Sequence, residues 1–113
     1  MRKGRYIGQK AHTSILKRQK WSTPSMFVKA NFLATAEVRH RGGTPDLDNA
    51  GRLRGVTSPD GVRKKVEVAL VGPGQSAIFR NGNPGLDVNV FIFTDCAGGF
   101  WLVTADEVRQ ARS

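Results

Sequence analysis

Five carboxylates between residues 37 and 67 are the side chains whose types and spacing could do chemistry. Metal-dependent phosphodiester cleavage needs hard oxygen ligands, because Mg²⁺ takes one or two carboxylates together with water and phosphate. The sequence places one acid in a predicted helix, two acids two residues apart, one in a turn and one in a predicted strand. These residues are Glu37, Asp46, Asp48, Asp60 and Glu67.

The three aspartates also have a structural interpretation, because Asp is a common turn residue beside Pro and Gly. The sequence favours that interpretation for all three. A metal-dependent enzyme would rely on Glu37, Asp60 and Glu67, with Mg²⁺ as its only cofactor. Without that activity we expect no cofactor and no metal. Two histidines and one cysteine are too few for a structural zinc site.

Positive charge is the second chemical feature of the chain, whose 113 residues carry a formal net charge of +9. Seven Lys or Arg and no acid lie in the first twenty residues, and a second basic group occupies residues 52–65. A one-sided positive field attracts a polyanion, usually nucleic acid. The expected phosphate contacts are Arg2, Lys3, Arg5, Lys10, Lys17, Arg18, Lys20, Arg52, Arg54, Arg63, Lys64 and Lys65.

Hydrophobic periodicity indicates which elements carry these residues. Residues 1–20 read as a basic arm without a clear period, and residues 21–113 as a single domain. A capping box, Thr104 with Glu107, opens the last helix. The predicted fold is α+β: an antiparallel-rich sheet of four to five strands with an N-terminal helix and a capped C-terminal helix. The predicted helices are 24–41 and 105–112, and the strands 52–57, 62–71, 77–80, 86–94 and 100–103.

Composition excludes several classes of protein. No apolar run approaches the roughly 20 residues that cross a bilayer, and no apolar segment follows the basic N-terminus as in a secretory signal. One cysteine excludes an internal disulfide and fits a reducing compartment, so we expect a cytoplasmic protein without a membrane partner. The common nucleotide-binding and hydrolase motifs are absent from the sequence.

Three segments resemble, in their order, small members of the PD-(D/E)XK, or restriction-endonuclease-like, nuclease superfamily. They read FLATAEVRHRGGTPD, RLRGVTSPDGVRKKVEVALV and LDVNVFIFTDCAGGFWLVTADEV, and they span roughly two-thirds of the chain. The resemblance implies a helix that carries an acid, which Glu37 would match. A hairpin should follow, with an acid-x-Lys motif in its second strand.

The chain departs from that pattern at the expected active site. The acid-x-Lys position reads Glu67-Val68-Ala69, without the lysine, and the preceding strand contains no acid. The resemblance therefore implies a degenerate member that binds DNA and does not cut it. The stretch PDLDN, residues 45–49, also resembles the Asp-Leu-Asp-Asn stretch of RusA-type Holliday-junction resolvases, although no helix is indicated after it.

Three functions follow from these observations. The leading one is a small, non-catalytic nucleic-acid-binding protein that contacts phosphate through the arm and the 52–65 hairpin, with DNA favoured over RNA. The second is a metal-dependent endonuclease or junction resolvase. The third is a protein-interaction accessory module of a mobile element or phage. An open edge strand would also allow a homodimer.

Overall fold

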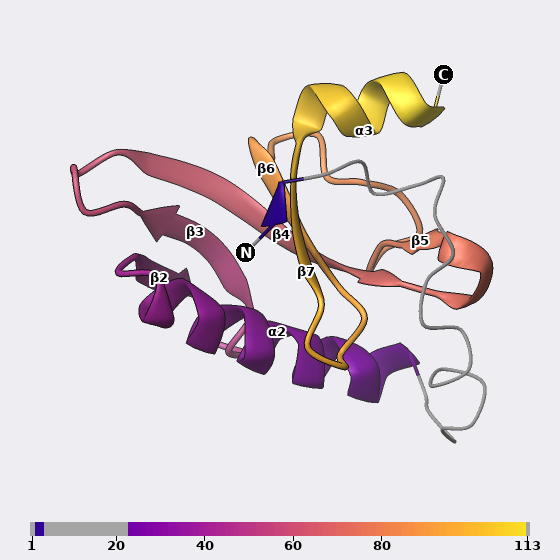
Figure 1. The fold of residues 1–113 in the computed structure, drawn as a ribbon, viewed down its shortest axis with the longest axis horizontal. Helices are drawn as coiled ribbons and strands as arrows, with labels where there is room; N and C mark the ends of the chain where they lie inside the picture. Colours follow the sequence, from indigo (N-terminus) through magenta and orange to yellow (C-terminus); the bar gives the residue numbers. More distant parts are fainter. Residues whose placement is uncertain (1, 4–22, 113) are drawn as a thin grey trace.

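The computed structural model describes residues 2–3 and 23–112, which form one mixed sheet with a helix on each side (Figure 1). The fold class is α+β with a mostly antiparallel sheet, which confirms the prediction. The helices are α2 (Thr23–His40) and α3 (Ala105–Arg112), with a 3-10 turn at Pro73–Gln75. The strands are β1 (Arg2–Lys3), β2 (Thr44–Leu47), β3 (Leu53–Thr57), β4 (Arg63–Val71), β5 (Ala77–Ile78), β6 (Val90–Thr94) and β7 (Phe100–Thr104).

A glycine in the left-handed conformation follows the end of α2. Gly42 has a φ of +84°, and the N–H of Gly43 donates to the carbonyl of Val38 at 2.9 Å. No helix within the described residues is both long and apolar enough to cross a bilayer. The stripe that α2 buries repeats at helical spacing and consists of Met26, Ala30, Ala34 and Val38.

The sheet has the strand order β1-β7-β6-β4-β3-β2, with β5 paired to the end of β4. An antiparallel meander joins β2, β3 and β4, and β6 pairs antiparallel with β7. The two units meet where β4 and β6 run parallel. Residues 72–89 form the crossover between them, through the 3-10 turn and β5 rather than a helix. Both units therefore depend on β4.

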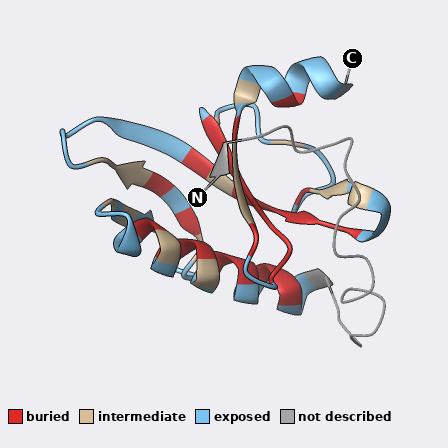
Figure 2. Cartoon of the chain, in the orientation of Figure 1, coloured by how far each residue is buried: buried red, intermediate tan, exposed pale blue. Residues whose placement is uncertain are grey.

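Each face of the sheet has its own apolar cluster. The central strand β6, which supplies both, is buried along its length (Figure 2). Val68 and Ile92 belong to the cluster beneath α2. Phe79, Phe91 and Phe93 form the other, with ring centroids 5.6 to 6.3 Å apart, and α3 contributes to it. Successive strand residues point to opposite faces, so β4 and β6 supply both clusters.

Two stretches differ from the sequence prediction. Residues 44–47 were expected to be a turn, but they form the edge strand β2, where Pro45 is tolerated because an edge leaves one side without ladder bonds. The strand expected over residues 86–94 begins only at Val90. The residues before it turn, and the side chain of Leu86 is fully exposed.

Only a small part of the predicted basic arm is described. Arg2 and Lys3 form β1, which pairs parallel with β7 at one edge of the sheet. These two residues are therefore strand residues rather than part of an irregular arm. The other predicted arm contacts lie outside the described residues: Arg5, Lys10, Lys17, Arg18 and Lys20.

Candidate nucleic-acid interface

A gap in the sheet lies beside the middle of β4. On that side, β3 pairs with β4 only as far as Lys65, and β5 pairs with it from Leu70 onward. Residues 66–69 therefore have no strand partner on this side within the part of the chain that the structure describes. On the other side, β6 pairs with β4 without interruption from Val66 to Leu70.

A β-bulge and a buried amide hold β3 away from β4. Consecutive residues of β2 pair with Leu53 and with Gly55, so Arg54 is an extra residue in β3. The N–H of Leu53 donates to Oδ1 of Asn31 at 2.9 Å. Asn31 is buried on α2, and its Nδ2 donates to the carbonyl of Phe27 at 2.8 Å. A helix side chain thus takes the hydrogen bond that a neighbouring strand would otherwise receive.

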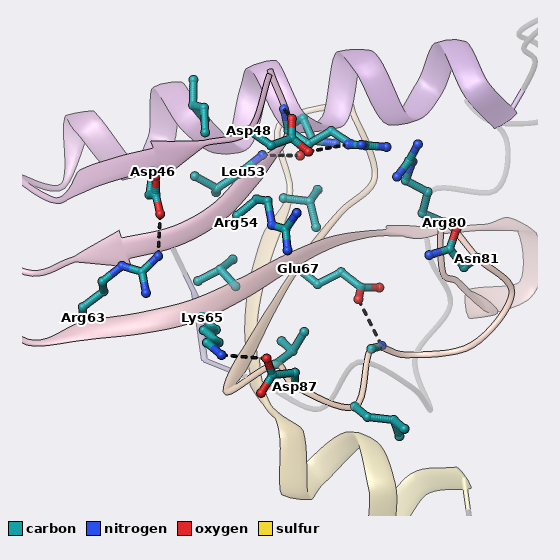
Figure 3. Close-up of a pocket in the computed structure, with 18 residues that line it drawn as sticks. Asp46, Asp48, Leu53, Arg54, Arg63, Lys65, Glu67, Arg80, Asn81 and Asp87 are labelled. Carbon is teal, nitrogen blue, oxygen red and sulfur yellow. Dashed lines mark hydrogen bonds and ion pairs between the residues drawn. The ribbon is translucent and has the colours of Figure 1, made fainter. Parts of the chain in front are cut away.

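A hollow of about 420 Å³ occupies this gap (Figure 3). Its buried lining consists of three apolar residues, Leu53, Val66 and Val68, together with the polar Asn31, whereas its exposed lining is mostly charged. The volume falls in the range of small-molecule sites in proteins. The basic side chains that line it are Arg52, Arg54, Arg63, Lys65 and Arg80.

Three of these five cations are bound to acids of the same hollow. Arg52 Nε lies 2.8 Å from Asp48 Oδ2, and Lys65 Nζ lies 2.6 Å from Asp87 Oδ2. The hydrogen bond from Lys65, followed by its charge, lowers the pKa of Asp87. The third pair joins Arg63 to Asp46 (Figure 3).

The remaining two cations, Arg54 and Arg80, are different. Both are exposed, and neither makes an ion pair or a side-chain hydrogen bond within the described residues. Arg54 comes from the bulge in β3, and Arg80 from the loop after β5 (Figure 3). Two elements far apart in sequence thus bring two unneutralised guanidinium groups to one hollow.

Glu67 is the fourth acid that lines the hollow, and it is the one without a cation partner among the described residues. It is half-buried, and its Oε1 accepts a hydrogen bond from the N–H of Gly85 at 3.0 Å. Burial raises the pKa of Glu67, and the Gly85 hydrogen bond partly opposes that increase. A Cβ on Gly85 would lie 2.7 Å from Oε1, so a residue without a side chain permits this approach.

The carboxylates predicted as a catalytic set are not brought together. Glu37 forms an ion pair with Arg41 along α2, at 3.5 Å. Asp60 lies in the turn between β3 and β4, where the hydroxyl of Ser58 donates to it and lowers its pKa. Of these three predicted catalytic acids, only Glu67 lines the hollow. Among the described residues, no group of three or more His, Cys, Asp or Glu could hold a metal ion.

The turn interpretation is correct for two of the three aspartates. Asp60 closes its turn as described, and Asp48 accepts hydrogen bonds from the N–H groups of Ala50 and Arg52. The hydrogen bond from the backbone N–H of Arg52, followed by the one from its side chain, lowers the pKa of Asp48. Asp46 is instead a β2 residue whose carboxylate binds Arg63 across the sheet.

The predicted phosphate contacts divide between two distant parts of the sheet. Four of them, Arg52, Arg54, Arg63 and Lys65, line the hollow, and Lys64 does not. Arg2 and Lys3 belong to β1, which β7, β6 and β4 separate from β3. The described part of the arm and the hairpin are therefore not adjacent strands.

Sequence reasoning missed Arg80. The sequence placed it at the end of a short predicted strand, residues 77–80, within a stretch rich in glycine and proline, but β5 ends at Ile78 and Arg80 lies in the loop after it. The one local signal is that this cation directly follows Phe79. Phe79 is buried and therefore anchors the start of the loop. Its proximity to Arg54 depends on how β4 pairs with β5, and no local pattern encodes that pairing.

No family model, curated protein or solved structure matches this chain. The resemblance to PD-(D/E)XK nucleases therefore stays a prediction, as does a homodimer formed through an edge strand.

Proposed function

We propose that this protein binds nucleic acid, with DNA favoured over RNA, through the hollow beside β4, and that it does not cleave it. The observation that carries the proposal is the pair Arg54 and Arg80, two exposed guanidinium groups without acidic partners among the described residues. Guanidinium groups form bidentate hydrogen bonds with phosphate oxygens. An anion can bind these two groups without displacing a carboxylate that is paired with either of them among the described residues.

The three paired cations support the same function. Their ion pairs involve side chains that are wholly or partly exposed to water. Exposed ion pairs contribute only about 0–1 kcal/mol, so a phosphate can replace a carboxylate partner at small cost. The net charge of +9 adds a long-range attraction to any polyanion.

Non-catalytic binding follows from the state of the acids in the hollow. Three of them, Asp46, Asp48 and Asp87, already bind cations, and Glu67 is held by a peptide N–H in a half-buried position. Cleavage with Mg²⁺ would need carboxylates that converge on one ion. If plasmid or branched DNA were cut in the presence of Mg²⁺ or Mn²⁺, and Glu67→Gln abolished the cut, the non-catalytic proposal would be wrong.

The test is the salt dependence of binding to a fluorescent DNA duplex, measured by anisotropy between about 50 and 200 mM salt. We expect the logarithm of the affinity to fall linearly with the logarithm of the salt concentration. Replacing Arg54 and Arg80 by Ala together should weaken binding and reduce the slope by about 2, since each lost phosphate contact removes about 0.9.

The matched control is Arg109→Ala. Arg109 is also exposed, but it lies on α3, pairs with Asp106 and does not line the hollow. Its variant should keep the slope of the wild type. An affinity that does not respond to salt, or a double variant with an unchanged slope, would contradict the proposal. Absence of binding to both DNA and RNA would favour the protein-interaction function.

A further inference from the structure

We propose that the hollow receives one unpaired nucleotide of the bound strand, with its base in the gap beside β4 and its phosphates at Arg54 and Arg80. This inference rests on the proposed nucleic-acid binding and specifies the form of nucleic acid that fits. A flat basic surface would suffice for the backbone of a regular duplex. That function does not need a hollow of about 420 Å³ whose lining includes the buried side chains of Leu53, Val66 and Val68.

The edge of β4 offers hydrogen-bonding groups inside the gap. The N–H of Lys65 donates to Oδ1 of Asn89 at 2.8 Å, and its carbonyl accepts from the N–H of Asn89 at 3.0 Å, both on the β6 side. Backbone groups of successive strand residues point to opposite sides. The N–H and carbonyl groups of Val66 and Val68 therefore point away from β6, toward the gap. Val68 lies beyond the β3 pairing and before the β5 pairing. A donor and an acceptor on one backbone edge suit the polar edge of a base.

The walls of the gap suit the faces of a base. Leu53, Val66 and Val68 are buried, and Val88 lines the same hollow from the loop before β6. Enzymes and other proteins that hold an extruded base combine such apolar contacts with hydrogen bonds to the base edge. Arg54 and Arg80 stand at the exposed part of the lining, where the phosphates on either side of that nucleotide would remain (Figure 3).

Leu86 is an exposed apolar residue of the same hollow. Its side chain is 100 % exposed although it lines the hollow, so it is accessible to a bound nucleic acid. Proteins that unstack nucleic acid frequently insert an apolar side chain between neighbouring bases. Beside a hollow that accepts a base, Leu86 is placed to fill the space that the base leaves in the stack.

The experiment compares three fluorescent DNAs of equal length: a fully paired duplex, the same duplex with one unpaired 2-aminopurine, and the single strand. We expect the duplex with the unpaired base to bind at least about tenfold more tightly than the paired duplex, because the unpaired base has less stacking energy to lose. Its 2-aminopurine emission should also change on binding. Leu86→Ser should remove most of that preference.

The matched control is Val62→Ser, an exposed apolar residue beside β4 that does not line the hollow, and it should retain the preference. Equal affinity for the paired duplex and the duplex with an unpaired base would overturn this inference and leave the proposed function intact. Binding to none of the three DNAs would overturn both. If adenosine monophosphate alone competed as strongly as the oligonucleotide, the site would belong to a free nucleotide and the strand-bound inference would be wrong.

Discussion

The two units that share β4 differ in burial and in how completely their strands are paired. In the unit formed with β6 and β7, β6 is buried at all five positions, and its side chains fill both faces of the sheet. In the unit formed with β2 and β3, β2 is exposed at three of its four positions, and the sheet is interrupted beside residues 66–69. The fully buried strand lies where pairing is complete, and the candidate site lies where pairing is missing.

An interrupted hydrogen-bond ladder between two strands can itself create a binding site. A strand with neighbours on both sides presents only side chains, whereas a strand with one side open also presents its backbone. In this protein the opening is maintained by a bulge and by the amide of Asn31, both on the β3 side. Four substitutions test whether the two units differ as described.

The largest effect should come from the complete unit, through Phe93→Ala. Phe93 is fully buried against Phe79 and Phe91, so the variant should lose about 3–5 kcal/mol of unfolding free energy, measured by urea denaturation. The matched control is Phe32→Ala on α2, where the ring is 73 % exposed and the change should stay within about 0.5 kcal/mol. Similar losses in both variants would contradict the placement of the core.

An intermediate effect should come from the interrupted unit, through Asn31→Ala. The variant leaves the buried N–H of Leu53 without its acceptor, which should cost about 1–3 kcal/mol. It should also weaken DNA binding, because β3 loses the contact that positions Arg54. Asn81→Ala, at an exposed asparagine of the same hollow, is the control for stability. Equal unfolding free energies for the two variants would show that the amide does not hold β3.

The smallest effect should come from Glu67→Gln and should depend on pH. Burial raises the pKa of Glu67, so the folded protein holds this proton more tightly than the unfolded chain does. The resulting stability is complete below the usual value of 4.5 and is lost as the pH rises through the raised value. At neutral pH the variant should therefore be more stable than the wild type by about 1 kcal/mol or less, since the group is half-exposed.

Asp87→Asn, in the same hollow, should change the unfolding free energy at neutral pH in the opposite direction. Lys65 lowers the pKa of Asp87, so the stability from this carboxylate is present at neutral pH and is lost as the pH falls through the lowered value. This variant should be less stable than the wild type at neutral pH, with the difference disappearing in acid. Urea denaturation of both variants across acid and neutral pH measures the two trends, and parallel trends would refute the assignment.

The sequence predicted the elements whose signals are local. The apolar stripe of α2, the turn at Asp60 and the capping box of α3, in which Thr104 and Glu107 exchange hydrogen bonds, are all present. It also predicted most of the basic residues that line the hollow. These patterns need only the residues within a few positions of one another.

The hollow could not be predicted, because it depends on contacts between distant residues. The hydrogen bond from Leu53 to Asn31 joins residues 22 positions apart, and the proximity of Arg80 to Arg54 depends on strand pairing across β4. Propensity also favoured a turn at Pro45, where the structure has an edge strand. The predicted catalytic acids illustrate the same limit, since the sequence did not show which of them share a cavity, and of the three only Glu67 lines the hollow.

The parallel pairing of β4 with β6 has a consequence for how the chain folds. The β3–β4 and β6–β7 hairpins join strands that are close in sequence, and contacts of that kind form on a microsecond timescale. Pairing β4 with β6 first requires residues 72–89 to close as a loop, which loses chain entropy before any contact compensates for it. We therefore expect the hairpins to form before the parallel ladder, and the rate of that later closure to limit how fast a newly made chain acquires its two cores.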